Sequence, residues 1–118
     1  EEAKERYGQD IRVYRNYLRE TDRAVTDLEE EGLAKVICDK KGHILGAHIV
    51  GANAGEIIHE YVIIKSQKLT VGRLSSTIHI YPTLAQVVKK TGDQYLLEKL
   101  NSPMLKKFAK FLMRLSLM

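Results

Sequence analysis

The chain has 118 residues, 44% hydrophobic and 29% charged, which are ordinary values for one globular domain that buries about two thirds of its unfolded surface. No apolar run approaches the ~20 residues of a membrane helix, and we expect neither a membrane span nor a signal peptide. The net charge of +4 comes entirely from Lys106, Lys107, Lys110 and Arg114, so the remaining chain is neutral in sum and a nucleic-acid-binding groove is not expected.

The first thirty residues predict a helix, a strand and a loop. Residues 2–7 precede Gly8, which stops a helix well because glycine adopts the left-handed backbone conformation at little cost. Apolar and charged residues alternate from Ile11, which predicts a strand that continues towards Tyr17. Residues 20–31 are acidic and lack periodicity, so we expect a loop there.

The next segment predicts a β-hairpin followed by a helix. Residues 33–38 and 43–50 are rich in β-branched and apolar residues, and 39–42 supply a turn that ends in glycine. Near Asn53 the period becomes helical, and the apolar face is wider than one sheet contact requires. We therefore expect a second surface, besides the sheet, to bury part of this face. The face is made of Ile57, Ile58, Tyr61, Val62 and Ile64.

A loop over 75–82 and a long helix follow. Thr83 and Gln86 have the spacing of a capping box, which predicts that the helix begins at Thr83. Helical spacing continues through Leu84, Val87, Val88, Thr91, Tyr95 and Leu96.

Pro103 breaks this pattern, and 104–118 predict a separate helix. One stripe is apolar, and the other side is basic; the stripe consists of Leu105, Phe108, Ala109, Leu112 and Leu115. A basic amphipathic helix either lies on an anionic membrane or packs on a protein surface. We favour packing against the domain, or disorder of a segment cut from its parent, over membrane contact.

Cysteine and histidine usage excludes several kinds of site. Cys38 is the one cysteine, so there is no internal disulfide or redox pair, and its strand position favours a small buried hydrophobe over a reactive thiol. One cysteine also fits a reducing compartment, and we expect a cytoplasmic location. His43, His48 and His59 show no ligand spacing, so no metal site is expected. The chain also lacks a G-x-G-x-x-G dinucleotide turn.

Three stretches occur together in one order: ETDRA at 20–24, GLAKVICDKKGHILGAHIVGANAGEIIHE at 32–60, and IHIYPTLAQ at 78–86. They resemble the C-terminal dimerisation domain of the pyridine nucleotide-disulfide oxidoreductases, flavoenzymes that include lipoamide dehydrogenase, glutathione reductase and mercuric reductase. The resemblance implies an α+β fold, a two-layer sandwich of an antiparallel sheet packed with helices. It assigns residues 1–101 to this domain, with its first strand missing, and leaves 102–118 as a basic extension.

The resemblance also implies a site. In the family a His-Pro-Thr-x-x-Glu loop carries an acid/base pair that reaches across the dimer to the other subunit's flavin and redox disulfide. Here Tyr81 and Gln86 occupy the His and Glu positions. A phenol with an ordinary pKa of about 10 is a hydrogen-bond donor at neutral pH, and glutamine does not ionise. Pro82 and Thr83 are carried over as residues that line the partner subunit's FAD.

Each residue also has a structural explanation. For Tyr81 the alternative to a chemical role is simple packing in an extended loop before the proline, while Gln86 is favoured as a helix cap over a catalyst. His79 is a candidate catalytic residue beside Tyr81 or a hydrogen-bonded structural histidine. The tyrosine is similar to that of the mercuric-reductase-like branch, which implies a metal or another soft electrophile as substrate.

Two functions from different classes therefore stand. The first is the dimerisation domain of an FAD- and NAD(P)H-dependent oxidoreductase that forms a homodimer, with FAD and NAD(P) domains upstream. On this hypothesis the domain alone binds no cofactor and has no activity. The second is a stand-alone interaction or regulatory module that kept the fold after losing the redox cysteines and the His-Glu pair. A weaker third is a membrane-associated adaptor acting through 104–118.

Overall fold

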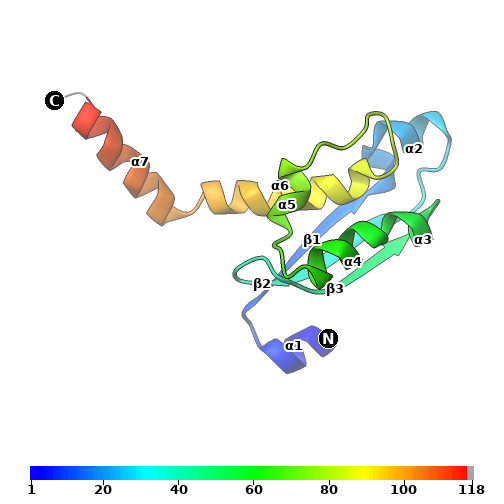
Figure 1. Cartoon of the computed structure of the whole chain (residues 1–118), viewed down its shortest axis with the longest axis horizontal. Helices are drawn as coiled ribbons and strands as arrows, with labels where there is room; N and C mark the ends of the chain where they lie inside the picture. The colour runs from blue at the N-terminus through cyan, green and yellow to red at the C-terminus, as the bar shows by residue number, and fades with distance from the viewer. Residues whose placement is uncertain (117–118) are drawn as a thin grey trace.

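The computed structural model describes residues 1–116, and Figure 1 shows a sheet covered by helices, with one helix projecting from the end. Strands β1 (Ile11–Tyr17), β2 (Leu33–Asp39) and β3 (Ile44–Val50) form an antiparallel sheet in that order. Tyr14 pairs with Val36, and Val36 pairs with Ala47. The predicted hairpin is confirmed.

The helices lie between and after the strands. Helix α6 packs on β1 and β2, and α4 packs on β3, so the two helices form the second layer. The predicted two-layer α+β architecture is confirmed. The helices are α1 (Glu2–Tyr7), α2 (Asp22–Thr26), α3 (Ala54–Ile57), α4 (His59–Ser66), α5 (Gly72–Ser76), α6 (Gln86–Leu100) and α7 (Pro103–Ser116), with a 3₁₀ turn η1 (Leu18–Glu20).

The core lies between the sheet and the two helices. Alternate residues of β2, namely Ala34, Val36 and Cys38, are fully buried, as the two-residue period of a strand requires. Tyr61 of α4 and Thr91 of α6 are also buried, and their hydroxyls form a 2.9 Å hydrogen bond. This bond satisfies two polar groups that would otherwise be costly to bury.

Close packing of α5 on α6 fixes where the following loop begins. A Cβ atom at Gly92 of α6 would lie 2.8 Å from the carbonyl oxygen of Val71 and 2.9 Å from the Cβ atom of Leu74. Glycine therefore lets α5 approach more closely than any other residue would allow. The chain leaves α5 at Ser76 and returns to α6 through the loop of residues 77–85.

Two sequence predictions about elements are wrong. The loop expected over 20–31 contains α2, anchored by fully buried Ala24 and preceded by η1 with fully buried Leu18. These elements are too short for a helical period to be visible. The single helix expected from Asn53 is broken into α3 and α4 at Ile58. Its apolar face is divided, since Ile57, Tyr61 and Ile64 are buried while Val62 is exposed.

The tail forms the predicted separate helix α7 over Pro103–Ser116, while residues 117 and 118 of the expected helix lie outside the described residues. The favoured packing of this helix on the domain is wrong for the described residues, because the side chains of 103–115 are exposed and the helix contacts α6 where the chain turns. Figure 1 shows α7 pointing away from the sheet. No helix of the described part has the length and apolar character that a bilayer span requires.

Candidate functional site

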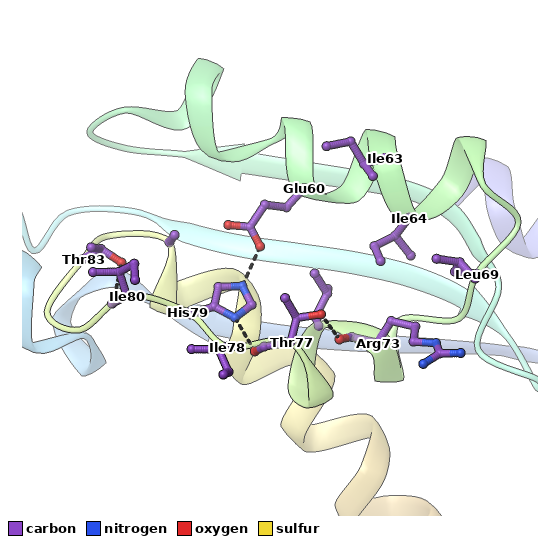
Figure 2. Close-up of a pocket in the computed structure, with 12 residues that line it drawn as sticks. Glu60, Ile63, Ile64, Leu69, Arg73, Thr77, Ile78, His79, Ile80 and Thr83 are labelled. Carbon is purple, nitrogen blue, oxygen red and sulfur yellow. Dashed lines mark hydrogen bonds and ion pairs between the residues drawn. The ribbon is translucent and has the colours of Figure 1, made fainter.

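The loop between α5 and α6 borders a groove of about 700 Å³. Figure 2 shows α4 and the loop on opposite sides of this groove, with aliphatic side chains from both. The loop contains a cis peptide bond between Tyr81 and Pro82. The aliphatic lining comes from Ile63, Ile64, Leu69, Leu74, Ile78, Ile80 and Ala85, and the polar lining from Glu60, Arg73, Thr77, His79 and Thr83.

His79 is held in the wall of this groove by contacts to both ring nitrogens. Its Nε2 lies 2.6 Å from a carboxylate oxygen of Glu60 on α4, and its Nδ1 lies 2.9 Å from the carbonyl oxygen of Thr77 (Figure 2). Both partners are hydrogen-bond acceptors, and the two contacts fix the orientation of the ring. The His79 side chain is only 6% exposed. These contacts tie the loop to α4.

Tyr81 has the opposite environment. Its side chain is exposed, and its hydroxyl donates a hydrogen bond to the carboxylate of Asp22 in the first turn of α2. This hydrogen bond and the negative charge of Asp22 raise the pKa of Tyr81 above its ordinary value of 10.0. Tyr81 is therefore a neutral phenol near pH 7. It can donate a hydrogen bond there but cannot accept a proton as a base.

The predicted capping box of Thr83 and Gln86 is wrong. Helix α6 begins at Gln86, and the hydroxyl of Thr83 donates to the carbonyl oxygen of Ile80 instead of accepting from the helix. The side-chain amide of Gln86 reaches back over the loop and donates to the carbonyl oxygen of His79 at 3.4 Å. Both side chains therefore stabilise the loop by bonding to its carbonyl groups. In a capping box they would have bonded to the first N–H groups of the helix.

Several large aliphatic side chains around the groove face solvent. Ile78 is 92% exposed, Ile80 73% and Ile63 58%. Val62, the neighbour of Ile63 in the sequence of α4, is also exposed. We expected a second surface to cover the wide apolar face of α4. Among the described residues of this chain, none covers its exposed part. An exposed apolar patch of this kind is typical of a contact surface.

The structure brings together residues that sequence reasoning separated or missed. Tyr81 and His79 lie on one loop but face different partners, Asp22 and Glu60. Neither carboxylate was a candidate in the sequence analysis, because neither belongs to the loop that carries the family motif. The Asp22 pairing spans 59 residues of sequence, and the Glu60 pairing spans 19. No local motif relates residues at these separations.

The thiol of Cys38 lies outside the site. It is fully buried, as predicted, and burial together with the nearby charge of Asp39 raises its pKa from 9.0 to about 12. A thiol of this kind stays protonated and is a poor nucleophile.

Comparison with known proteins places this geometry in a family. The profile of the family described as "Pyridine nucleotide-disulphide oxidoreductase, dimerisation domain" matches residues 1–91. The chain belongs to this family. It is 40% identical over 94 residues to a dihydrolipoyl dehydrogenase of Corynebacterium glutamicum, covering 78% of this chain and 20% of that protein. It is also 40% identical over 84 residues to a dihydrolipoyl dehydrogenase of Rhizobium etli, covering 70% of this chain and 18% of that protein.

Solved structures share the fold of this dimerisation domain. The HOCl-induced flavoprotein disulfide reductase RclA from Escherichia coli matches with a TM-score of 0.72 and 23% identity, over 79% of this chain and 22% of that chain. LpdA from Mycobacterium tuberculosis matches with a TM-score of 0.71 and 22% identity, over 79% and 20%. The chain thus spans about a fifth of the length of the relatives that it matches. The family resemblance seen in the sequence is confirmed.

Proposed function

We propose that this dimerisation domain belongs to an FAD- and NAD(P)-dependent oxidoreductase that works as a homodimer in the cytoplasm. Residues 1–101 are assigned to the domain and 102–118 to an extension. The support is the family membership and the size of the relatives, whose remaining four fifths have no counterpart in this chain. This chain also has one cysteine and no G-x-G-x-x-G turn, so redox and nucleotide sites must be supplied by other domains.

The surface proposed for the second copy is the exposed apolar face of α4 and the loop, which we call the groove face. It is defined by the exposed groove residues Ile63, Ile78 and Ile80. These side chains lose water contact only if another surface covers them, and apolar burial is the main favourable term in protein association. The hydrogen bond between the His79 ring and the Glu60 carboxylate joins the loop to α4 across the groove.

The catalytic part of the proposal rests on the position and surroundings of Tyr81. It stands where the family loop carries its histidine, it is exposed, and Asp22 orients its hydroxyl. Because its pKa is raised, it offers a proton in a hydrogen bond but does not take one up at neutral pH. Gln86 stands at the glutamate position and cannot ionise. The acid/base relay to a dithiol is therefore proposed to be absent.

His79 is proposed as a positioning residue beside Tyr81. Both of its ring nitrogens are already engaged, by Glu60 and by the Thr77 carbonyl, so neither is free for an acceptor outside the chain. Its contribution would be to hold the loop on which Tyr81 stands. Tyr81 and His79, both candidate catalytic residues in the sequence, are therefore proposed to have different roles.

The exposed part of the loop fits contact with the flat ring of a flavin held by another subunit. Ile80, Tyr81 and Pro82 present apolar side chains and one hydroxyl on an exposed surface. Pro82 and Thr83 are the residues proposed to line the FAD, while the Thr83 hydroxyl is used within the loop. Bound FAD would supply electron transfer between the nicotinamide and the acceptor. The domain would supply shape, one donor and exclusion of water.

The acceptor is proposed to be a soft electrophile such as Hg(II), as in the mercuric-reductase-like branch. The support is the neutral phenol at position 81 and the loss of the ionisable pair, since dithiol-disulfide interchange needs a group that exchanges a proton near neutrality. The relatives named above are dihydrolipoyl dehydrogenases, which makes an organic disulfide the competing acceptor. The two acceptors are separable by experiment.

The test compares NAD(P)H oxidation by the full-length parent enzyme with Hg(II) and with a disulfide. Tyr81→Phe should slow the reaction with Hg(II) at least tenfold, because the donor is lost, whereas Tyr7→Phe on the distant helix α1 should not. The double variant Tyr81→His with Gln86→Glu restores the family pair and should raise the rate with a disulfide. Unchanged rates for Tyr81→Phe with both acceptors would exclude the proposed role of Tyr81.

The second candidate remains a stand-alone interaction module, favoured by the missing redox cysteines and ionisable pair. The reading frame upstream of Glu1 separates the candidates. Continuation into a flavin domain with a C-x-x-x-x-C pair supports the enzyme, and a start codon near Glu1 supports the module.

A further inference from the structure

Helix α7 presents an apolar face that the described part of the chain leaves uncovered. It begins after Ser102, whose hydroxyl accepts the backbone N–H of Leu105 and whose carbonyl accepts that of Lys106, and Pro103 occupies the first helical position. These are strong helix-starting features. The helix then projects from the end of α6, away from the sheet (Figure 1). Its large apolar side chains are exposed.

The two kinds of side chain are separated around this helix. At about 100° per residue, the four cations fall within an arc of about 100°. Six large apolar residues fall on the opposite side, within about 120°, namely Met104, Leu105, Phe108, Phe111, Leu112 and Leu115, whereas Met113 falls at the edge of the cationic arc. No acidic residue follows Glu98 in the sequence, so the helix is purely cationic on its polar side. A partner must therefore cover an apolar face and also attract positive charge.

A second copy of α7 would cover the apolar face but would not attract its positive charge. Two such helices could meet through their apolar faces, but both would bring lysine or arginine to the margins of the contact. Paired helices in water normally use opposite charges at those margins, and like charges there repel. A nucleic acid would attract the positive charge but would not cover the apolar face, because phosphates would bind the cations and leave Phe108, Phe111 and Leu112 in water.

We propose that α7 is a docking helix for an anionic lipid surface. The helix would lie in the plane of the membrane, with its apolar face at the boundary of the acyl chains and its cations at the headgroup phosphates. Both faces would then be satisfied at once, which is the arrangement typical of basic amphipathic helices. The helix is about 20 Å long at 1.5 Å per residue, long enough to place all four cations at the surface.

This inference does not depend on the proposed function. The family profile ends at residue 91, before α7 begins at Pro103, so nothing in the family assignment supplies the helix or its charge. The rest of the chain is neutral in sum, so α7 alone carries the attraction to an anionic surface. Lipid docking would bring the domain to a membrane surface whether or not it joins a flavoenzyme.

The test uses the whole 118-residue chain and fluorescence. The chain contains no tryptophan, so Phe108→Trp introduces a single reporter on the apolar face. We expect its emission to shift to the blue with vesicles of mixed phosphatidylglycerol and phosphatidylcholine, and not with phosphatidylcholine alone. Tyr7→Trp, on α1, is the matched reporter and should not shift. Added salt should weaken binding, because it screens the attraction.

Three double variants of the reporter chain separate the contributions of charge and apolar burial. Lys106→Glu with Lys110→Glu should weaken vesicle binding at least tenfold, since each basic residue near an anionic surface contributes about fivefold in affinity. Lys4→Glu with Lys41→Glu makes the same change in net charge outside α7 and should bind as the parent chain does. Leu112→Ser with Leu115→Ser should also lose binding. Unchanged circular dichroism at the start of each titration verifies folding.

Three results would overturn the proposal. The first is no blue shift with anionic vesicles. The second is equal binding by the two charge-reversed variants, which would mean that net charge and not α7 directs the protein. The third is a blue shift that depends on protein concentration without vesicles, which would assign the apolar face to a second copy of the chain.

Discussion

The buried core and the loop of residues 77–85 use similar residue types for opposite purposes. In the core, Ala34, Val36 and Cys38 are fully buried by helices of the same chain. In the loop, Ile78 and Ile80 are exposed, while the loop's polar groups are bonded to Glu60, Asp22 and backbone carbonyls. The apolar residues of the core are therefore buried within the chain itself. The aliphatic residues of the loop would be buried only by contact with a surface outside the chain.

The largest expected difference between the regions is in stability. Tyr61 is 2% exposed, and Tyr61→Ala should lower the free energy of unfolding by about 3–4 kcal/mol through lost burial and a cavity. Ile78→Ala on the loop should change it by less than about 0.5 kcal/mol. Urea unfolding of the two variants measures both values. Similar losses for both would show that Ile78 packs within its own chain.

Loss of the contact between His79 of the loop and Glu60 of α4 is expected to have an intermediate effect on stability. His79→Leu leaves the partly buried carboxylate of Glu60 without its partner and should cost about 2 kcal/mol in urea unfolding. Glu60→Gln keeps an acceptor for the ring and should cost about half as much. The exposed His48 supplies the control His48→Leu, which should be nearly neutral. A loss no larger than that of the control would mean that the pair does not hold the loop.

The core also predicts a pH dependence. Burial raises the pKa of Cys38 from 9.0 in the unfolded chain to about 12 in the folded chain, so the folded state binds this proton more tightly. The stabilising contribution is complete below pH 9.0 and is lost as pH rises towards 12, by about 1.4 kcal/mol per pH unit.

Cys38→Ala should remove this part of the alkaline loss. Urea unfolding at pH 8 and pH 10 should show a smaller fall for the variant than for the wild-type chain. The buried Tyr14 and Tyr61 also have raised pKa values, mainly through desolvation, and leave a residual fall above their ordinary value of 10.0. Identical pH profiles would indicate that Cys38 titrates normally.

The smallest expected effect concerns Tyr81. Asp22→Asn keeps a hydrogen-bond acceptor but removes the charge, so the pKa of Tyr81 should fall towards 10.0 while the stability of the fold stays nearly unchanged. Phenolate absorbance, taken as the difference from Tyr81→Phe in each background, isolates this titration. Asp27→Asn is the control on the same segment. A pKa that does not move would exclude the contact with Asp22 in solution.

The same contrast explains how far the sequence could predict the molecule. The hairpin follows from local alternation and a glycine turn, so it was predictable, as was the separate helix after Pro103. Helix α2 spans only Asp22–Thr26 and depends on the burial of Ala24, which is a tertiary effect. A period cannot be read from so few residues.

The side-chain contacts of the loop were not predictable from the sequence. The residues of the loop were identified through the family motif, whereas their partners Asp22 and Glu60 lie far away in sequence. Thr83 and Gln86 matched a local capping pattern, yet their side chains bond to the carbonyls of Ile80 and His79. The loop turns back over the start of α6, and this competing geometry is invisible in a four-residue motif.

The central claim is that the groove face binds a second copy of the chain. Sedimentation equilibrium of the 118-residue chain tests it most directly, with Leu112→Ser and Leu115→Ser present throughout to prevent association through α7. We expect a dimer that becomes a monomer when Ile63→Asp and Ile78→Asp are introduced, because buried unpaired carboxylates oppose association. A monomer at every concentration, or a dimer unchanged by the two aspartates, would contradict the account.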